Sequence, residues 1–591
     1  MDNPPPSIRD QYARVVLLDY QDRYGSVPNS PPLPQRDGNA INVGILGGGS
    51  AGLYAAMLLS DINNKFQTNF TFDILEANPK RLGGRLYSQP IGTSPDTSDY
   101  IDVGAMRFPQ IPIMERTFTL FQKLNINTST DKNPPNGSLI PYIMSTDQNL
   151  NFFNEIIKTN AELNTQPPPP DPFNTKELTQ PPEQVIESKI GIYKQKLENN
   201  LRAEWPTILE LDGMSMRSFL ASPLGGFTSQ KTINTLETLE SGTNFYDSAL
   251  LEMIMEDMTF HWYSTPDPKV DWFTVQGGSS EIANAMASGV KDRIKMGNAV
   301  TAISPNLAQD GSWTSVNVDV LSQGATSPTT TTYDHVISTL PLGCFIGIDT
   351  SKCNFDWDLR QAIRSLQYGN SVKVGIRFKY RWWETEQNQF GGVSPTDRPT
   401  RMVVYPSYGH SPNGDVTGTT MIVSYSWGQD ANRLGALCQG PGTPEEQRLL
   451  DLIMRDLSDM HGITDYTHLP GLYVDHFAWN WDVNEYSAGA FALFGPGQFR
   501  SLYPRVTASF GGLLHFAGEA TSVHHAWLVG ALNSAFRAVY QILYAENVPN
   551  LDSILSYLQQ TWGKDDEFDE NLHQKQLDIG RYHPIANQGS R

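Results

Sequence analysis

Apolar residues change their spacing within the segment that starts at Ile41. The run NVGIL predicts a buried strand, the glycines of GGGSAG predict a tight turn, and LYAAMLLSDI predicts a helix. A second apolar run, FDILEA, predicts a strand that ends at Glu76. This order of strand, turn, helix and strand is typical of the nucleotide-binding half of a doubly wound α/β fold.

Other segments predict helices and strands in separate blocks. Between about 146 and 260, NFFNEIIKTNAEL and YDSALLEMIMEDM place apolar residues three and four positions apart, which predicts a helical insertion. WTSVNVDVLSQG and TTTTYDHVISTLP alternate like paired strands, and VKVGIRF and TMIVSYSW predict further strands. Near the end, a strand, a turn and a long helix from about Trp527 are expected, and LDSILSYLQQTWG predicts one more helix.

The two ends of the chain are polar. Residues 1–40 are rich in proline and predict an arm laid over the surface, with order beginning at Ile41. The acidic run KDDEFDE and the residues after it predict a solvated tail.

The composition excludes some functions. The 591 residues are enough for more than one domain, and a formal charge of -20 repels phosphate backbones and anionic lipid. We therefore expect neither nucleic acid nor membrane as a partner. Three cysteines predict neither a disulfide framework nor a metal site, so no residue is assigned to a metal. No secretory signal is visible at the start, which favours the cytoplasm, whereas a trimmed N-terminus would fit a secreted protein.

The glycine turn predicts a dinucleotide site. Gly47 permits the tight turn, Gly49 lets backbone amides approach a pyrophosphate, and Gly52 allows the helix to lie against the strand. The helix N-terminus, with Ser50 and Ala51 in its first turn, favours the negative charge of phosphates. Glu76 lies 24 residues past Gly52, a spacing suited to a ribose hydroxyl.

Two further motifs resemble the flavin amine oxidases. They are EANPKRLGGRLYS, which contains Gly84 and Arg85, and FAGEATSVHHAW, which contains Glu519. The resemblance spans about 41–543 and implies an FAD cofactor. No cysteine follows Cys438, and the covalent members of this family attach flavin through a cysteine in the C-terminal part, so the FAD is expected to be non-covalent. The expected cofactor-binding residues are Gly47, Gly49, Ser50, Ala51, Gly52, Glu76, Arg81, Gly84, Arg85, Met106, Arg107, Val300, Trp481, Gly518, Glu519, Trp527 and Leu528.

The stretch DVGAMRFP resembles the substrate-binding motif of L-amino-acid oxidases. Those enzymes have Gly-Pro-Met-Arg, and this chain has alanine in place of the proline before Met106 and Arg107. A guanidinium matches a carboxylate bidentately, so the resemblance implies that Arg107 binds the substrate carboxylate. It also implies that Tyr425 is a second clamp, that Lys373 holds a water near the flavin, and that Trp527 and Trp481 lie beside the flavin, with Trp479 as a rival to Trp481. The expected catalytic residues are Arg107, Tyr425, Lys373 and Trp527.

The resemblance implies oxidative deamination. An L-amino acid would lose a hydride from its alpha carbon, water would convert the imino acid to a 2-oxo acid and ammonia, and dioxygen would yield hydrogen peroxide. The alternatives are an amine or polyamine oxidase, an amino-acid monooxygenase, and a flavin-binding protein without oxidase activity. A homodimer is the expectation for the family.

The sequence thus predicts an α/β fold, mixed with α+β character, in which a Rossmann-like FAD-binding domain is interleaved with a mixed-sheet substrate domain and a helical insertion. The expected divisions are an N-terminal arm (1–40), an FAD-binding domain (41–90, 276–345 and 500–548), a substrate-binding domain (91–145 and 346–499), a helical domain (146–275), and a C-terminal helix and tail (549–591).

Overall fold

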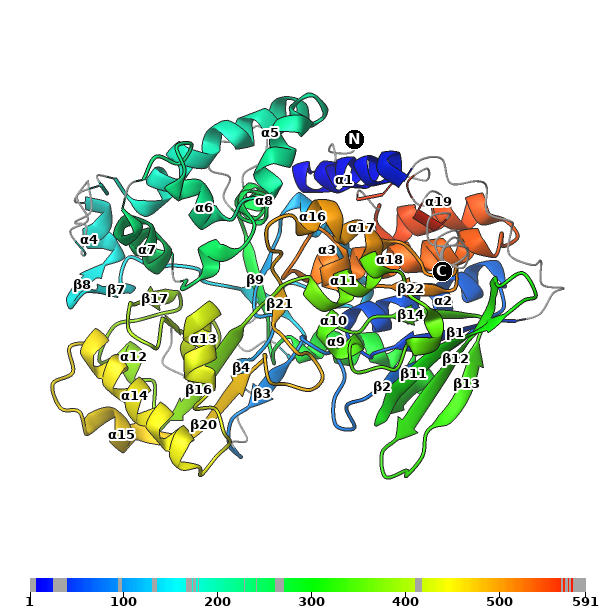
Figure 1. Ribbon diagram of the computed structural model, residues 1–591. Coiled ribbons are helices and arrows are strands. Elements are labelled where there is room, and N and C mark those ends of the chain that lie inside the picture. Colours follow the sequence, from blue (N-terminus) through cyan, green and yellow to red (C-terminus); the bar gives the residue numbers. More distant parts are fainter. Residues whose placement is uncertain are drawn as a thin grey trace.

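The computed structural model describes most of the chain. The described residues are 7–24, 40–93, 98–129, 135–165, 173, 177, 178, 180–227, 229–240, 242–260, 270–409, 417–564, 567, 568, 572, 576 and 577. Two sheets and a group of helices make up three parts of the molecule, and the predicted α/β class is confirmed (Figure 1).

A parallel sheet forms the first part. Its strand order is β10 (Ile294–Met296), β2 (Phe70–Glu76), β1 (Ile41–Leu46), β14 (His335–Ser338) and β22 (Leu514–Phe516). All four strand pairs are parallel, so their carboxyl ends meet at one edge. The strand, helix and strand predicted from Ile41 to Glu76 are confirmed.

Helices cover this parallel sheet. The central ones are α2 (Ser50–Phe66) and α18 (Leu528–Ala545). These two helices pack on each other, and nearly every residue of α18 is buried. The others are α3 (Glu115–Lys123), α9 (Ser280–Ser288), α10 (Leu342–Phe345), α11 (Trp357–Ser365), α16 (Gln498–Ser501), α17 (Tyr503–Thr507) and α19 (Leu551–Trp562). Short 3-10 turns are η1 (Pro112–Met114), η2 (Phe245–Asp247), η3 (Lys291–Arg293), η4 (Ser351–Cys353) and η5 (Glu519–Thr521). The long helix expected from Trp527 is confirmed.

The predicted strand pair near 313–340 is also confirmed. A three-stranded sheet contains β11 (Asn298–Leu307), β12 (Trp313–Ser322) and β13 (Thr329–Tyr333). Strands β12 and β13 are antiparallel, and the apolar end of the second segment continues as β14 in the parallel sheet.

The second five-stranded sheet is antiparallel. Its order is β17 (Val393–Pro395), β18 (Met402–Val404), β19 (Thr420–Trp427), β16 (Ser371–Phe378) and β20 (Tyr473–Asn480). In Figure 1 it lies with α12 (Trp382–Thr385), α13 (Gly428–Gly435), α14 (Pro444–Met460) and α15 (His468–Leu472) at the lower left. Small sheets link the parts: β3 (Ser88–Pro90) with β4 (Tyr100–Asp102), β5 (Phe108–Pro109) and β6 (Leu139–Pro141) with β9 (Trp272–Val275), and β15 (Tyr368–Gly369) with β21 (Phe491–Ala492).

The helical insertion is only partly as predicted. Helices α5 (Pro182–Asp212), α6 (Met216–Ala221), α7 (Gln230–Leu239) and α8 (Leu250–Phe260) are present. NFFNEIIKTNAEL, however, forms a hairpin of β7 (Leu150–Phe153) and β8 (Ile156–Thr159) before the short helix α4 (Asn160–Thr165). The helical prediction was wrong there because Asn154 and Glu155 both take positive φ, which turns the chain back.

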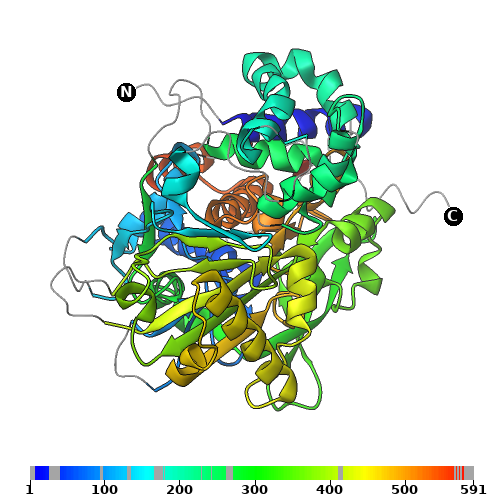
Figure 2. The same cartoon turned by 90° about the vertical axis from the view of Figure 1, so that its left-hand side faces the viewer.

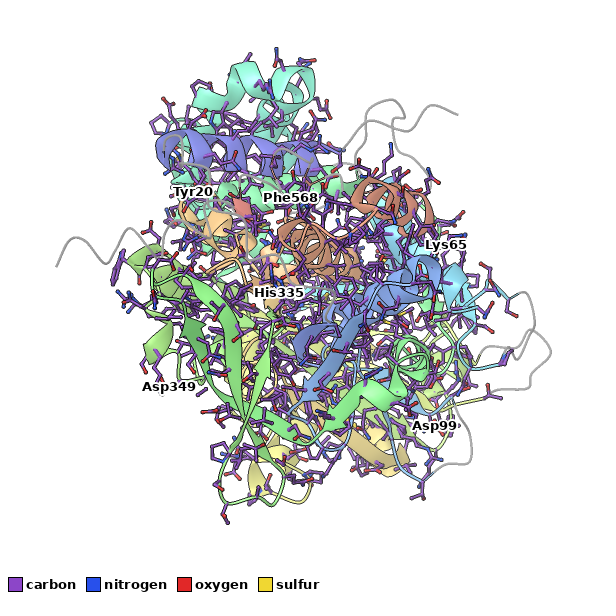
Figure 3. All side chains as sticks on the ribbon, turned by 90° about the vertical axis from the view of Figure 1, so that its right-hand side faces the viewer. Tyr20, Lys65, Asp99, His335, Asp349 and Phe568 are labelled. Carbon is purple, nitrogen blue, oxygen red and sulfur yellow. The ribbon has the colours of Figure 1, made fainter. Side chains whose placement is uncertain are left out.

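Both polar ends contradict the sequence prediction. Helix α1 (Ile8–Tyr24) precedes Ile41, and its stripe of Tyr12, Val16 and Tyr20 is buried. In Figure 2 this blue helix lies beside the green helices, in agreement with its contacts to α5 and α8. The tail is not simply solvated either, because Phe568 is 3% exposed. Figure 3 labels Tyr20 and Phe568 in the same region, where Gln21 of α1 also bonds Gln576.

No helix in the described parts of the chain has both the length and the apolarity needed to span a membrane.

Candidate active site

A cavity of about 530 Å³ lies where the parallel sheet, the antiparallel sheet and α8 meet. Residues from all three parts line it, although they are hundreds of positions apart in the sequence. With one exception, every residue that the sequence assigned to cofactor binding or catalysis is on its wall. These are Gly47, Gly49, Ser50, Ala51, Glu76, Arg81, Gly84, Arg85, Met106, Arg107, Val300, Lys373, Tyr425, Trp481, Gly518, Glu519, Trp527 and Leu528.

The exception, Gly52, lies behind the wall and keeps the glycine turn closed. A Cβ atom on Gly52 would sit 2.0 Å from the carbonyl oxygen of Gly47, so only glycine allows α2 to approach β1 this closely. Gly47 itself has a φ of 102°. Gly49 caps α2 without any side-chain hydrogen bond, and it faces the cavity. An uncapped helix N-terminus on a cavity wall fits a phosphate group.

Glu76 holds the other side of this turn. Its carboxylate accepts hydrogen bonds from the backbone N–H of Gly48 at 2.7 Å and of Asn78 at 2.6 Å. Burial raises the pKa of Glu76, and the two N–H groups oppose that shift. A side chain on Gly48 would come within 3.0 Å of this carboxylate, so Gly48 is a requirement of the turn that the sequence pattern did not single out.

Arg85 and Glu519 join the two family motifs directly. Their side chains form an ion pair of 2.6 Å on the cavity wall. Burial disfavours the charge of Arg85, but the Glu519 carboxylate outweighs it and raises the pKa of the guanidinium. Glu519 also accepts the N–H of Ala492 at 3.0 Å and of Ala526 at 3.3 Å. The pair therefore fixes three distant segments around one end of the cavity.

Arg107 has no carboxylate partner in the part of the chain that the structure describes. Within the described residues it forms no ion pair, and its guanidinium lies 3.7 Å from the sulfur of Met144 and 5.7 Å from the ring centre of Trp272. It lines the cavity, so its charge is available to a bound anion. The charge also acts on nearby groups, because it lowers the pKa of both Lys373 and Tyr425 relative to burial alone.

Lys373 lies in the interior of the antiparallel sheet and is 2% exposed. Its amine donates hydrogen bonds to the carbonyl oxygens of Asp102 at 2.9 Å and Gly104 at 2.8 Å. Burial, together with Arg107, lowers its pKa to about 7, although Asp102 opposes that shift. Tyr425 is opposite Lys373 in the β16–β19 register, with its ring centre 4.5 Å from the amine.

Trp481 faces the cavity, whereas its neighbour Trp479 does not. Its N–H donates to the carbonyl oxygen of Val103 at 3.1 Å, which fixes the ring on the wall. Trp479 packs against Phe477 behind it and does not line the cavity. Of these two tryptophans, Trp481 is the one on the cavity wall.

A carboxylate network on α8 was missed by sequence reasoning. Glu252 and Glu256 line the cavity and are four residues apart, so they lie on one face of the helix. The indole N–H of Trp527 donates to Glu256 at 3.2 Å, and His525 Nδ1 lies 2.8 Å from Glu252. Arg9, from α1, bonds both carboxylates. The four-residue spacing of Glu252 and Glu256 was the signal in the sequence that could have indicated this network.

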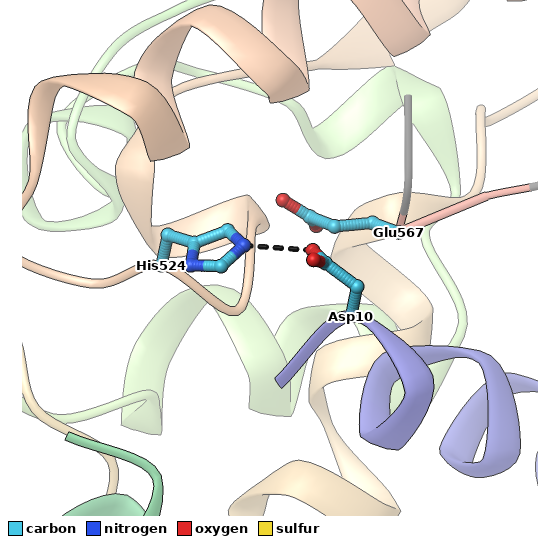
Figure 4. A group of neighbouring side chains, drawn as sticks. All are labelled: Asp10, His524 and Glu567. Atoms are coloured by element: carbon cyan, nitrogen blue, oxygen red, sulfur yellow. Dashed lines mark hydrogen bonds and ion pairs between the residues drawn. The ribbon is translucent and has the colours of Figure 1, made fainter. Parts of the chain in front are cut away.

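The neighbouring histidine, His524, belongs to a buried cluster behind this turn. Its Nε2 lies 2.8 Å from Asp10 of α1, and Glu567 of the tail lies next to them (Figure 4). The three ligand-type atoms are within 4.8 Å of one another. Burial opposes the charge of His524, but Asp10 raises its pKa. The cluster thus joins both ends of the chain to the turn that carries Trp527.

The fold and the glycine turn define a dinucleotide-binding protein. The family model for flavin-containing amine oxidoreductases matches residues 50–543. The chain belongs to this family and is a flavin-dependent oxidoreductase.

Relatives differ in the substrates that their names give. L-amino-acid oxidase 4 of Hebeloma cylindrosporum is 35% identical, over 95% of this chain and 91% of that protein. A protein of Dictyostelium discoideum, provisionally named a bifunctional amine oxidase, is 36% identical over 92% of this chain, which spans only 50% of that protein. Among solved structures, cyclohexylamine oxidase from Brevibacterium oxydans has a TM-score of 0.61 at 17% identity, covering 86% of this chain and 99% of that one. The structural likeness establishes the fold.

Proposed function

We propose that the protein is an FAD-dependent oxidase of L-amino acids, which forms a 2-oxo acid, ammonia and hydrogen peroxide. The observation that carries the proposal is the guanidinium of Arg107 on the cavity wall, which has no carboxylate partner among the described residues. An amine substrate offers nothing to such a group, whereas the carboxylate of an amino acid does. The identity to the Hebeloma L-amino-acid oxidase supports the same substrate class.

The residues at the glycine-turn end suit FAD. The uncapped start of α2 would meet the pyrophosphate, Glu76 would meet the ribose, and Arg85 with Glu519 would lie along the rest of the cofactor. Cys344 also lines the cavity, but burial raises the pKa of its thiol to about 11. A protonated thiol is a poor nucleophile, which supports non-covalent binding.

The chain positions its substrate with Arg107 and Tyr425. Arg107 would hold the carboxylate, and Tyr425 would donate a second hydrogen bond, because burial raises the pKa of its phenol and keeps it protonated. A bound flavin supplies an acceptor for the hydride of the alpha carbon and passes the electrons to dioxygen. Water then converts the imino acid to the 2-oxo acid and ammonia.

Lys373 would hold a water molecule. In a neutral amine the two bonds to carbonyl oxygens account for both hydrogens, so the lone pair, on the side of the Met106 sulfur at 3.6 Å, remains as an acceptor. A pKa of about 7 keeps much of the amine neutral at physiological pH. A water bound there can give up a proton as dioxygen is reduced or as the imino acid is hydrolysed.

The test compares L-leucine with its decarboxylated amine in a coupled peroxide assay. We expect peroxide, ammonia and 2-oxo acid from leucine and little turnover of the amine. Preference for the amine would instead favour an amine oxidase, the activity that the Dictyostelium relative's name gives. Release of an amide and carbon dioxide would identify a monooxygenase. A flavin that no amino acid or amine bleaches without oxygen would indicate a binding protein.

A further inference from the structure

Glu256 presents a carboxylate to the cavity. It lines the wall from α8, and its side chain is 40% exposed. Three other glutamates of that wall are buried, namely Glu76, Glu252 and Glu519, and Glu519 is paired with Arg85. Glu485 is exposed, but it lies at the glycine-turn end, where its carbonyl oxygen accepts a bond from Cys344.

Two neighbours hold the Glu256 carboxylate in place. Arg9 donates to one oxygen at 2.7 Å, and the indole N–H of Trp527 donates to the other at 3.2 Å. Both neighbours are donors, which matches an acceptor-only carboxylate. Each oxygen therefore has one fixed partner and can accept another hydrogen bond from a group in the cavity.

Glu256 is the carboxylate that this part of the wall presents to the cavity. Arg9 brings one positive charge to two carboxylates, Glu252 and Glu256. Glu252 is turned inwards to Arg9 and to His525, which is 2.8 Å away. The exposed member of the pair is Glu256, so its carboxylate is the one that faces the cavity.

Contacts through two indoles connect Arg107 with Glu256. The Arg107 guanidinium is 5.7 Å from the ring of Trp272, the rings of Trp272 and Trp527 are 6.3 Å apart, and Trp527 bonds Glu256. Of these residues, Arg107, Trp527 and Glu256 line the cavity, so its wall offers a positive group, an apolar ring surface and a negative group. A molecule with a carboxylate, a hydrocarbon stem and a distant cationic group complements all three.

We infer that Glu256 makes the enzyme selective for L-amino acids with a cationic side chain, such as lysine and arginine. This inference rests on the proposed function, because it assumes that the substrate carboxylate binds Arg107. The ammonium or guanidinium of the side chain then lies beside Glu256 and donates a charge-assisted hydrogen bond to its carboxylate.

The test uses pairs of substrates that differ only in the cationic group. Wild-type kcat/KM is measured for L-lysine against L-norleucine and for L-arginine against L-citrulline, at a pH where the lysine side chain is protonated. We expect the charged member to be preferred about tenfold or more, as one charge-assisted bond provides. Glu256→Gln should lower that ratio about tenfold, Glu256→Asp should retain more of it, and Glu198→Gln, an exposed glutamate on α5 outside the cavity, should leave it unchanged.

Two results would overturn the inference. One is a wild-type enzyme that prefers norleucine and citrulline, a comparison that needs no variant to fold. The other is an unchanged ratio in Glu256→Gln with an unaltered flavin absorbance spectrum. Pentylamine, the decarboxylated counterpart of norleucine, separates this failure from failure of the proposed function. If pentylamine is preferred to norleucine, the amino-acid proposal fails; if norleucine is preferred and the ratio does not move, only the role of Glu256 fails.

Discussion

At the scale of single residues, Arg107 is a cation without a paired anion in the described part of the chain, so its replacement should affect substrates unequally. Arg107→Leu removes a charge-assisted contact worth about 1.5–3 kcal/mol, which corresponds to roughly a 10- to 100-fold loss of kcat/KM for L-leucine. The peroxide assay measures this loss. Arg202→Leu, on the exposed side of α5, is the matched control and should behave as wild type. An amine substrate lacks the carboxylate. An equal loss of kcat/KM for such an amine would show general damage to the active site and would contradict the carboxylate contact.

Lys373 gives the reaction a dependence on pH. Its pKa is lowered from 10.5 to about 7 in the folded protein, so the neutral amine that accepts a proton becomes predominant above about pH 7. We expect log kcat/KM to rise through this range in the wild type and the rise to be lost in Lys373→Met. The substrate amine titrates at higher pH and is common to both proteins, so the difference between the profiles isolates Lys373. Identical profiles would exclude the lysine as the titrating group.

The same shift has a defined sign for stability. Between about pH 7 and 10.5 the unfolded lysine binds a proton that the folded lysine does not, so the free energy of unfolding rises with pH across that window. Below pH 7 the lysine is protonated in both the folded and the unfolded chain, so its buried charge lowers the free energy of unfolding by the full amount. Lys373→Met should therefore raise Tm more at pH 7 than at pH 10, as thermal unfolding can measure.

At the scale of elements, α1 is part of the active-site structure although it precedes the family match. Arg9 is 3% exposed and bonds Glu252 and Glu256, the partners of His525 and Trp527. Arg9→Met breaks the buried ion pair with Glu252 and should lower the free energy of unfolding by about 3–5 kcal/mol. Arg9→Lys keeps a cation at this position and should restore part of the lost free energy of unfolding. Arg23→Met, on the exposed end of the same helix, should cost little.

If α1 only stabilised the fold, Arg9→Met would change the free energy of unfolding and nothing else. Because Arg9 fixes the partners of Trp527, Arg9→Met should also raise KM more than it lowers kcat and alter the visible circular dichroism of the bound flavin. Stability loss with unchanged KM and spectrum would mean that α1 does not position the cavity wall.

The elements also explain what the sequence could predict. The strand, turn and helix from Ile41 were predictable because Gly47 and Gly52 have steric roles that no other residue fills. Helix α1 was missed because the prolines around it dominated the composition, yet Tyr12, Val16 and Tyr20 already had helical spacing. The β7–β8 hairpin was mistaken for a helix because a short apolar run fits the period of a helix and that of a strand. The positive φ of Asn154, which turns the chain back, distinguishes the two.

The candidate site was predictable where motifs are local and not where packing assembles it. Arg85, Glu519 and Arg107 could be chosen from their motifs, but nothing in the sequence indicated that Arg9 reaches Glu256, 247 positions away. Such contacts depend on how α1 packs on α8, a consequence of burial that no local pattern encodes. Sequence reasoning therefore found the groups that resemble a family and missed those that this chain uses to hold them.

At the scale of the whole molecule, the cavity is walled by both large sheets and α8, so an occupant adds contacts between all three parts. A ligand that binds only the folded state stabilises it by about 2.7 kcal/mol at a concentration of 100 Kd. We expect acid precipitation to release free FAD, because the Cys344 thiol is protonated, and mild removal of FAD to lower Tm by several degrees. Added FAD should restore Tm and the yellow colour together. Flavin that stays with the precipitated chain, or a Cys344 peptide carrying its mass, would refute non-covalent binding.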